Sequence, residues 1–159
     1  MAKEVSGELA VFFAEMDSQV QAVQAIFAKL KKKIINMRVS DSELDSTGYQ
    51  LHNLYCAFVD LFLIVAKFFE NSIQDSARFH MELLKRMTLQ IPGVRPAYLT
   101  AENYRILNEL LAFRHVFRHS YGLDLDAGKL EALLMKVLSA EQNILADNTR
   151  FRDEVAENY

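Results

Sequence analysis

Helix-breaking residues are scarce in this chain, and both of its prolines lie in one short stretch. The 159 residues include two prolines and five glycines, and Pro92 and Pro96 both fall within QIPGVRPAYLT, residues 90–100. An all-β sandwich needs frequent turn residues, so this composition disfavours one and favours long helices. We therefore expect an all-α protein whose clearest loop covers residues 90–100.

Apolar residues on both sides of this loop recur at the three-and-four spacing of amphipathic helices. The spacing predicts about five helices, over residues 5–37, 40–73, 75–87, 100–122 and 127–147. Long amphipathic helices joined by short links form antiparallel bundles. Whether the polar residues 150–159 extend the last helix or fray stays open.

Capping signals support several of these boundaries. Ser40 and Glu43 have the spacing of a capping box at the start of the second helix. Thr100 is a suitable N-cap for the fourth helix, and Gly122 is a suitable residue just past its end. Gly48 marks a possible break within the second helix, because glycine is a poor helix former.

The length and composition suit a single domain, residues 1–159, without a membrane span. Hydrophobic residues make up 51% of the chain, which is enough for one continuous core. The most apolar run, LYCAFVDLFLIVAKFF, contains Asp60 and Lys67, so we expect it to be the central helix of a soluble bundle. The phenylalanines expected in the core and in a dimer contact are Phe12, Phe13, Phe58, Phe62, Phe68 and Phe69.

The charge and the single cysteine limit the partners and the compartment. A net charge of −3 excludes binding to nucleic acid through overall basicity, so any such contact needs a local patch. The run KLKKKIINMR, residues 29–38, either contacts an RNA backbone or is a solvated helix end. Cys56 has no partner for an intramolecular disulfide, and the N-terminus lacks a signal-peptide core, so we expect a cytoplasmic protein.

The segment LLAFRHVFRHSYGLDLD, residues 110–126, concentrates the groups that suit phosphodiester chemistry. On a helical wheel, an apolar face lies opposite the cationic side chains, which predicts an exposed basic surface on a firmly packed helix. The predicted core face consists of Ile106, Leu110, Phe113 and Phe117. The predicted basic surface consists of Arg114, His115, Arg118 and His119.

These residue types fit the cleavage of RNA without a metal. Such cleavage needs a base for the 2′-hydroxyl proton, an acid for the leaving 5′-oxygen and cations around the phosphorus. Guanidinium binds phosphate oxygens bidentately, and imidazole gives or takes a proton near neutral pH. One helix supplies one such set, so a symmetric homodimer would bring acid and base from different chains into one cleft.

Two further features have both a functional and a structural interpretation. His115 and His119 are one turn apart, as zinc ligands on a helix can be, but no third ligand is evident, so we expect neither metal nor cofactor.

Asp60 shares a stripe of its helix with His52 and Cys56. Its carboxylate either reaches solvent or a salt bridge, or orients Arg114 or His119 from across the bundle.

The segment resembles the motif of HepT toxins, which are HEPN superfamily ribonucleases of HEPN–MNT toxin–antitoxin systems. The family signature is arginine, four residues, histidine, one residue and tyrosine, and here it is Arg114, HVFR, His119, Ser120 and Tyr121. His115 fits the polar position that often follows the arginine. The resemblance implies a HEPN-like bundle acting as a metal-independent endoribonuclease, with Arg114 and His119 catalytic at a dimer interface and with His115 and Arg118 in support.

The resemblance also implies a partner. In the family, an MNT-type nucleotidyltransferase antitoxin transfers AMP onto the motif tyrosine, which here is Tyr121. A phosphate there would repel RNA and occupy the arginines. Two other functions stay open: a non-catalytic module that binds nucleotide or RNA, and a purely structural helical bundle.

Overall fold

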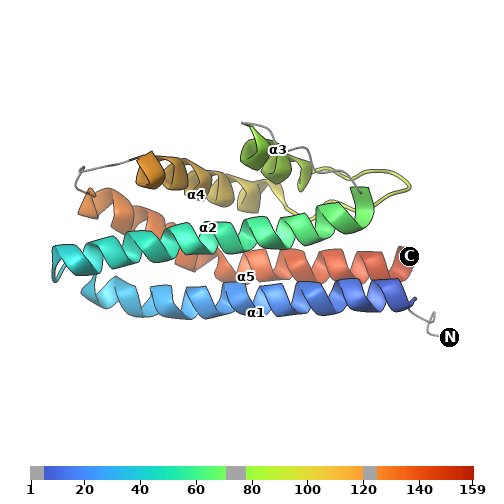
Figure 1. Ribbon diagram of the computed structural model, residues 1–159, viewed down its shortest axis with the longest axis horizontal. Coiled ribbons are helices and arrows are strands. Elements are labelled where there is room, and N and C mark those ends of the chain that lie inside the picture. Colours follow the sequence, from blue (N-terminus) through green and yellow to red (C-terminus); the bar gives the residue numbers. More distant parts are fainter. Residues whose placement is uncertain (1–5, 71–77, 120–124) are drawn as a thin grey trace.

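The computed structural model describes residues 6–70, 78–119 and 125–159, with the side chain of His119 excepted. Its five helices confirm the all-α prediction (Figure 1). They are α1 Gly7–Asn36, α2 Asp41–Glu70, α3 Phe79–Arg86, α4 Ala101–His119 and α5 Ala127–Asn158. Within the described ranges, the β-structure consists of one isolated antiparallel bridge between Ile91 and Arg95, in the predicted loop.

The four long helices run alternately up and down the long axis of the molecule (Figure 1). α1 packs on α2 and α5, α4 packs on α2 and α5, and the short α3 lies against α2 and α4. The beginning of α1 and the end of α5 lie at the same end of the bundle. The turn between α1 and α2, the end of α4 and the beginning of α5 lie at the opposite end.

The beginning of α2 is capped as predicted, although only by one half of the capping box. The hydroxyl of Ser40 accepts a hydrogen bond from the backbone N–H of Glu43 at 3.1 Å. The Glu43 carboxylate forms an ion pair with Lys33 of α1 at 3.0 Å. This ion pair joins the end of α1 to the first turn of α2, which suits the short connection between the two helices.

α2 continues without a break through Gly48, which is buried. A Cβ atom at this position would lie 2.9 Å from Leu125 Cδ1 and 3.2 Å from Phe117 Cε2. The glycine therefore lets the side chains of Phe117 on α4 and of Leu125 before α5 pack directly on the α2 backbone. The predicted role of Gly122 falls outside the described residues.

α5 is longer than predicted, because the tail at residues 150–159 extends the helix to Asn158. Asp126 caps the helix by accepting a hydrogen bond from Lys129 N at 3.0 Å. Phe151 and Val155 are buried, so the polar tail still carries an apolar stripe that packs on the bundle.

The core is rich in aromatic residues, as expected from the composition. Phe12, Phe13, Phe58 and Phe62 are buried. Phe68 and Phe69 are partly buried, and the Phe68 ring stacks on Phe12 with centroids 4.2 Å apart. α2 supplies the largest share of the buried residues; it is long and apolar enough to cross a membrane, but 56% of its most apolar window is buried inside the bundle.

A buried polar network fixes the first turn of α4 to α5. Asp147 is 4% exposed, and its Oδ2 accepts hydrogen bonds from Thr100 N at 2.9 Å, Thr100 Oγ1 at 3.0 Å and Asn103 Nδ2 at 2.6 Å. Its Oδ1 accepts from Arg150 at 2.8 Å. Asn103 Nδ2 also donates to the carbonyl of Asn143 at 3.0 Å. The carboxylate thereby holds the predicted cap residue, Thr100, in place.

Candidate anion site between α2 and α4

Arg114 lies on the stripe of α4 that faces the core. Asn103, Leu107 and Leu110 are buried, and the same helical repeat continues to Arg114 and Phe117, which are half-buried. The prediction that Arg114 points away from the core is therefore wrong. Ile106 and Phe113, on which that prediction depended, pack only at the edge of the core.

The Arg114 guanidinium has unused hydrogen-bonding capacity. Its Nε is buried and lacks a hydrogen-bond partner among the described residues. In the same part of the chain, no carboxylate forms an ion pair with it. An unsatisfied buried donor costs about 1–3 kcal/mol, so this arrangement favours the binding of an acceptor, and an anion most of all.

His52 of α2 faces this part of α4. Its ring centroid is 5.6 Å from that of Phe117, and its Nε2 lies 3.7 Å from the sulfur of Cys56. Its Nδ1 is buried and lacks a hydrogen-bond partner within the described ranges. Burial, followed by the charges of Arg114 and Arg118, lowers the pKa of His52 from its ordinary value, so the imidazole is neutral at neutral pH.

Tyr55, one turn after His52, completes the α2 side of the site. Burial raises the pKa of the Tyr55 phenol, and the positive charge of Arg114 opposes that rise. The same guanidinium thus acts electrostatically on two side chains of α2. The phenol is un-ionised at neutral pH, so it does not neutralise Arg114.

The other residues that the sequence predicts for the site are exposed, unlike Arg114, or have side chains outside the described part of the chain. His115 and Arg118 are exposed, as expected for the outer surface of α4. The backbone of His119 is the last residue of α4, but its side chain and Tyr121 lie outside the described residues. Asp60 is exposed on α2, eight residues and about 12 Å beyond His52, which fits the solvent-facing interpretation.

The sequence offered only a weak sign of His52. It shares a stripe of α2 with Cys56 and Asp60, and this spacing does not show which residue of another helix lies beside it. Arg114 and Arg118 meet His52 only because α2 and α4 pack together. No spacing within either segment shows this contact.

The basic run at the end of α1 is largely occupied by ion pairs. Lys31 binds Glu141 at 2.7 Å, Lys33 binds Glu43 at 3.0 Å and Arg38 binds Glu131 at 2.6 Å. These pairs tie α1 to α2 and α5, which favours a structural role for the run. Among residues 6–70, 78–119 and 125–159, no group of three His, Cys, Asp or Glu side chains could hold a metal ion.

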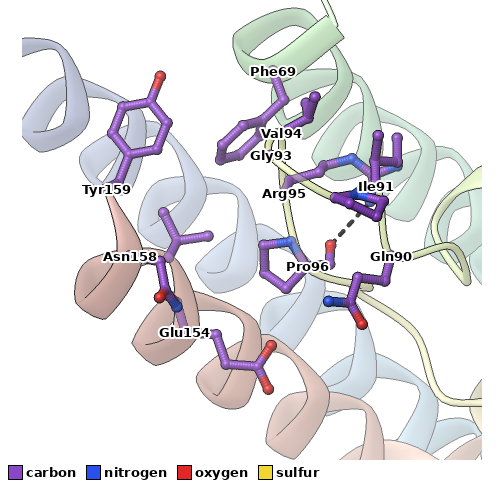
Figure 2. A pocket seen from close by; sticks show the side chains of 12 residues that line it. Phe69, Gln90, Ile91, Gly93, Val94, Arg95, Pro96, Glu154, Asn158 and Tyr159 are labelled. Atoms are coloured by element: carbon purple, nitrogen blue, oxygen red, sulfur yellow. Dashed lines mark hydrogen bonds between the residues drawn. The ribbon is translucent and has the colours of Figure 1, made fainter.

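A hollow of about 550 Å³ lies at the opposite end of the bundle (Figure 2). It is lined by Phe69, by the loop at residues 90–96 and by the end of α5. Gly93, with φ of 76°, shapes the loop, and Figure 2 shows the backbone hydrogen bond between Ile91 and Arg95. The buried Arg95 guanidinium donates to three backbone carbonyls, so most of its hydrogen-bonding capacity is already used.

The fold and the site together define a class: an all-helical bundle with cationic and imidazole groups at the end of a late helix. A family model described as HepT-like protein matches residues 46–155 of the 159-residue chain. The chain therefore belongs to the HepT-like family, and membership implies a HEPN-type toxin. No curated protein and no solved structure matches the chain.

Proposed function

We propose that the protein is the toxin of a toxin–antitoxin pair and a metal-independent endoribonuclease. The observation that carries the proposal is the half-buried Arg114, which has no carboxylate partner among the described residues and lies in the motif segment beside Arg118. A guanidinium in this state is available for a phosphate, and family membership gives the phosphate a source in RNA.

In the proposed reaction, Arg114 binds the scissile phosphate, Arg118 adds positive charge around it and His115 assists as a polar neighbour. The RNA 2′-oxygen loses its proton to a base and attacks the phosphorus, and the bond from phosphorus to the 5′-oxygen breaks. His119 protonates that leaving oxygen, which leaves a 2′,3′-cyclic phosphate and a 5′-hydroxyl. A symmetric homodimer supplies two such sets, so His119 of each chain can serve as acid or as base.

The proposed partner is an MNT-type nucleotidyltransferase antitoxin that AMPylates Tyr121, and the proposed compartment is the cytoplasm. AMP on Tyr121 would bring a phosphate to Arg114 and Arg118 and exclude the RNA. Mass spectrometry tests this: after incubation with ATP and an MNT-type nucleotidyltransferase of its family's antitoxins, the protein should gain adenylate on Tyr121. Adenylate absent from the wild-type protein, or unchanged in Tyr121→Phe, would contradict the assignment.

Cleavage is tested by incubating the purified protein with RNA in excess chelator. Removing one electrostatic group of this kind costs about 10²–10³ in rate, so we expect Arg114→Ala and His119→Ala to lose that much. Arg105→Ala is the matched control, because Arg105 is an exposed arginine on the same helix. Equal RNA loss in all four proteins would reject the proposal, and RNA binding without cleavage would indicate a non-catalytic binding module.

A further inference from the structure

We propose that His52 is the third member of the anion site formed with Arg114 and Arg118, and that it takes up a proton when a phosphodiester binds there. The inference rests on the part of the proposed function in which Arg114 binds a phosphate, but not on cleavage. It adds a residue from α2, outside the motif of α4.

The geometry places two buried nitrogens without hydrogen-bond partners on facing helices. His52 Nδ1 on α2 and Arg114 Nε on α4 are both buried, and neither has a hydrogen-bond partner in the part of the chain that the structure describes. Phe117 lies one turn after Arg114 and packs against the His52 ring. The imidazole is therefore held at the surface of α4 that carries the two guanidinium groups.

The charges that act on His52 come from the helix opposite. Arg114 and Arg118 of α4 both disfavour its protonation, Cys56 of α2 contacts its Nε2, and no carboxylate acts on it among the described residues. A phosphodiester bound to the two guanidinium groups offsets their charge at His52. Protonation of the imidazole then becomes favourable, and the new proton comes from the buffer.

Linkage makes this effect measurable in both directions. If a bound phosphodiester favours the protonated imidazole, the protonated imidazole favours the phosphodiester by the same factor. Each pH unit by which binding raises the midpoint of His52 titration corresponds to a tenfold gain in affinity between neutral and acidic pH. Affinity for the phosphodiester should therefore increase as pH falls from 7.5 to 5.5.

The probe is a 2′-O-methyl oligouridylate. It lacks the 2′-hydroxyl needed for cleavage, and neither its phosphodiester nor uracil titrates in this pH range. NMR of the wild-type protein follows the His52 ring signals from pH 5 to 8, with and without the probe. We expect the His52 midpoint to rise by about one unit on binding, while Arg114→Ala weakens binding and removes the rise.

Two variants separate His52 from the other histidines. His52→Gln should lose up to about tenfold of the pH-dependent gain in affinity, whereas the control variant His80→Gln, in a histidine of α3 outside the proposed site, should retain the rise of the His52 midpoint. An unchanged or lower His52 midpoint with the probe bound, or no binding of the probe at all, overturns the inference. A raised midpoint in a protein that leaves ordinary RNA intact would reject cleavage and keep the anion site.

Discussion

Among the described residues, the buried polar groups at the beginning of α4 are hydrogen-bonded, whereas two of those near its end lack hydrogen-bond partners. At its beginning, Asp147 accepts hydrogen bonds from Thr100 and Asn103 and forms an ion pair with Arg150. At its end, Arg114 Nε and His52 Nδ1 are buried without hydrogen-bond partners among the described residues. A satisfied network holds two helices together, whereas unsatisfied groups lower the stability of the free protein and recover it when a ligand binds.

The largest expected change in stability is at the beginning of α4, where the buried polar groups are hydrogen-bonded. Asp147→Ala removes the acceptor of Thr100 and Asn103 and one of the two carboxylates paired with Arg150. Each buried donor left unsatisfied costs about 1–3 kcal/mol, so the free energy of unfolding should fall by about 3–5 kcal/mol. Urea denaturation measures the loss. Asp153→Ala is the matched control, because Asp153 is exposed on the same helix and should change stability by less than about 0.5 kcal/mol.

The next effect concerns Gly48, which keeps the far end of α4 against α2. Gly48→Leu adds a side chain where Phe117 and Leu125 already lie, so we expect a loss of about 1–3 kcal/mol and weaker RNA cleavage. Gly48→Ala needs only small movements of those side chains and gains helix propensity, so its net change should be below about 1 kcal/mol. Equal destabilisation by the two variants would contradict this account of the contact.

A smaller change, this time a gain in stability, is expected from substituting Arg114. Arg114→Leu replaces an unsatisfied guanidinium on the core-facing stripe with an apolar side chain, so the free protein should become more stable by about 1 kcal/mol. The same variant should lose RNA cleavage. Thermal and urea unfolding measure the gain, and a clear loss of stability would show that the guanidinium has a structural partner.

The smallest effect is the pH dependence contributed by His52. Its pKa is lowered in the folded protein, so well above pH 6.5 the imidazole is neutral in both states and contributes nothing. As pH falls below that value, the unfolded chain takes up the proton first, which favours unfolding. Between pH 7 and pH 5, the wild-type protein should therefore lose more stability than His52→Gln in urea denaturation, and parallel losses would contradict the assignment.

Local patterns were sufficient to predict the helices. The capping residues Ser40, Thr100 and Asp126 lie where the predicted helices begin, since their hydrogen bonds are to residues three positions away. The tail at residues 150–159 was harder to predict because its apolar residues are sparse. Phe151 and Val155 are enough to keep it helical once they are buried against the bundle.

The orientation of α4 could not be predicted in this way. A helical wheel places polar residues outward, but Asn103 is buried because Asp147 of α5 binds it, and Arg114 follows on the same stripe. His52 enters the candidate site through the packing of α2 against α4, which no spacing within either helix encodes. The family motif indicated Arg114 as a site residue, whereas its inward position and its neighbour depend on tertiary contacts.

Gly48 has a consequence for control of the protein. Since Phe117 and Leu125 reach the same glycine, the end of α4 and the residue before Asp126 are both anchored to α2 at one place. The end of α4 therefore cannot move away from α2 unless the Phe117 ring first leaves Gly48. Any partner that draws this end of α4 outward must also break that contact, so Gly48 couples the position of Arg114 to the packing of α2.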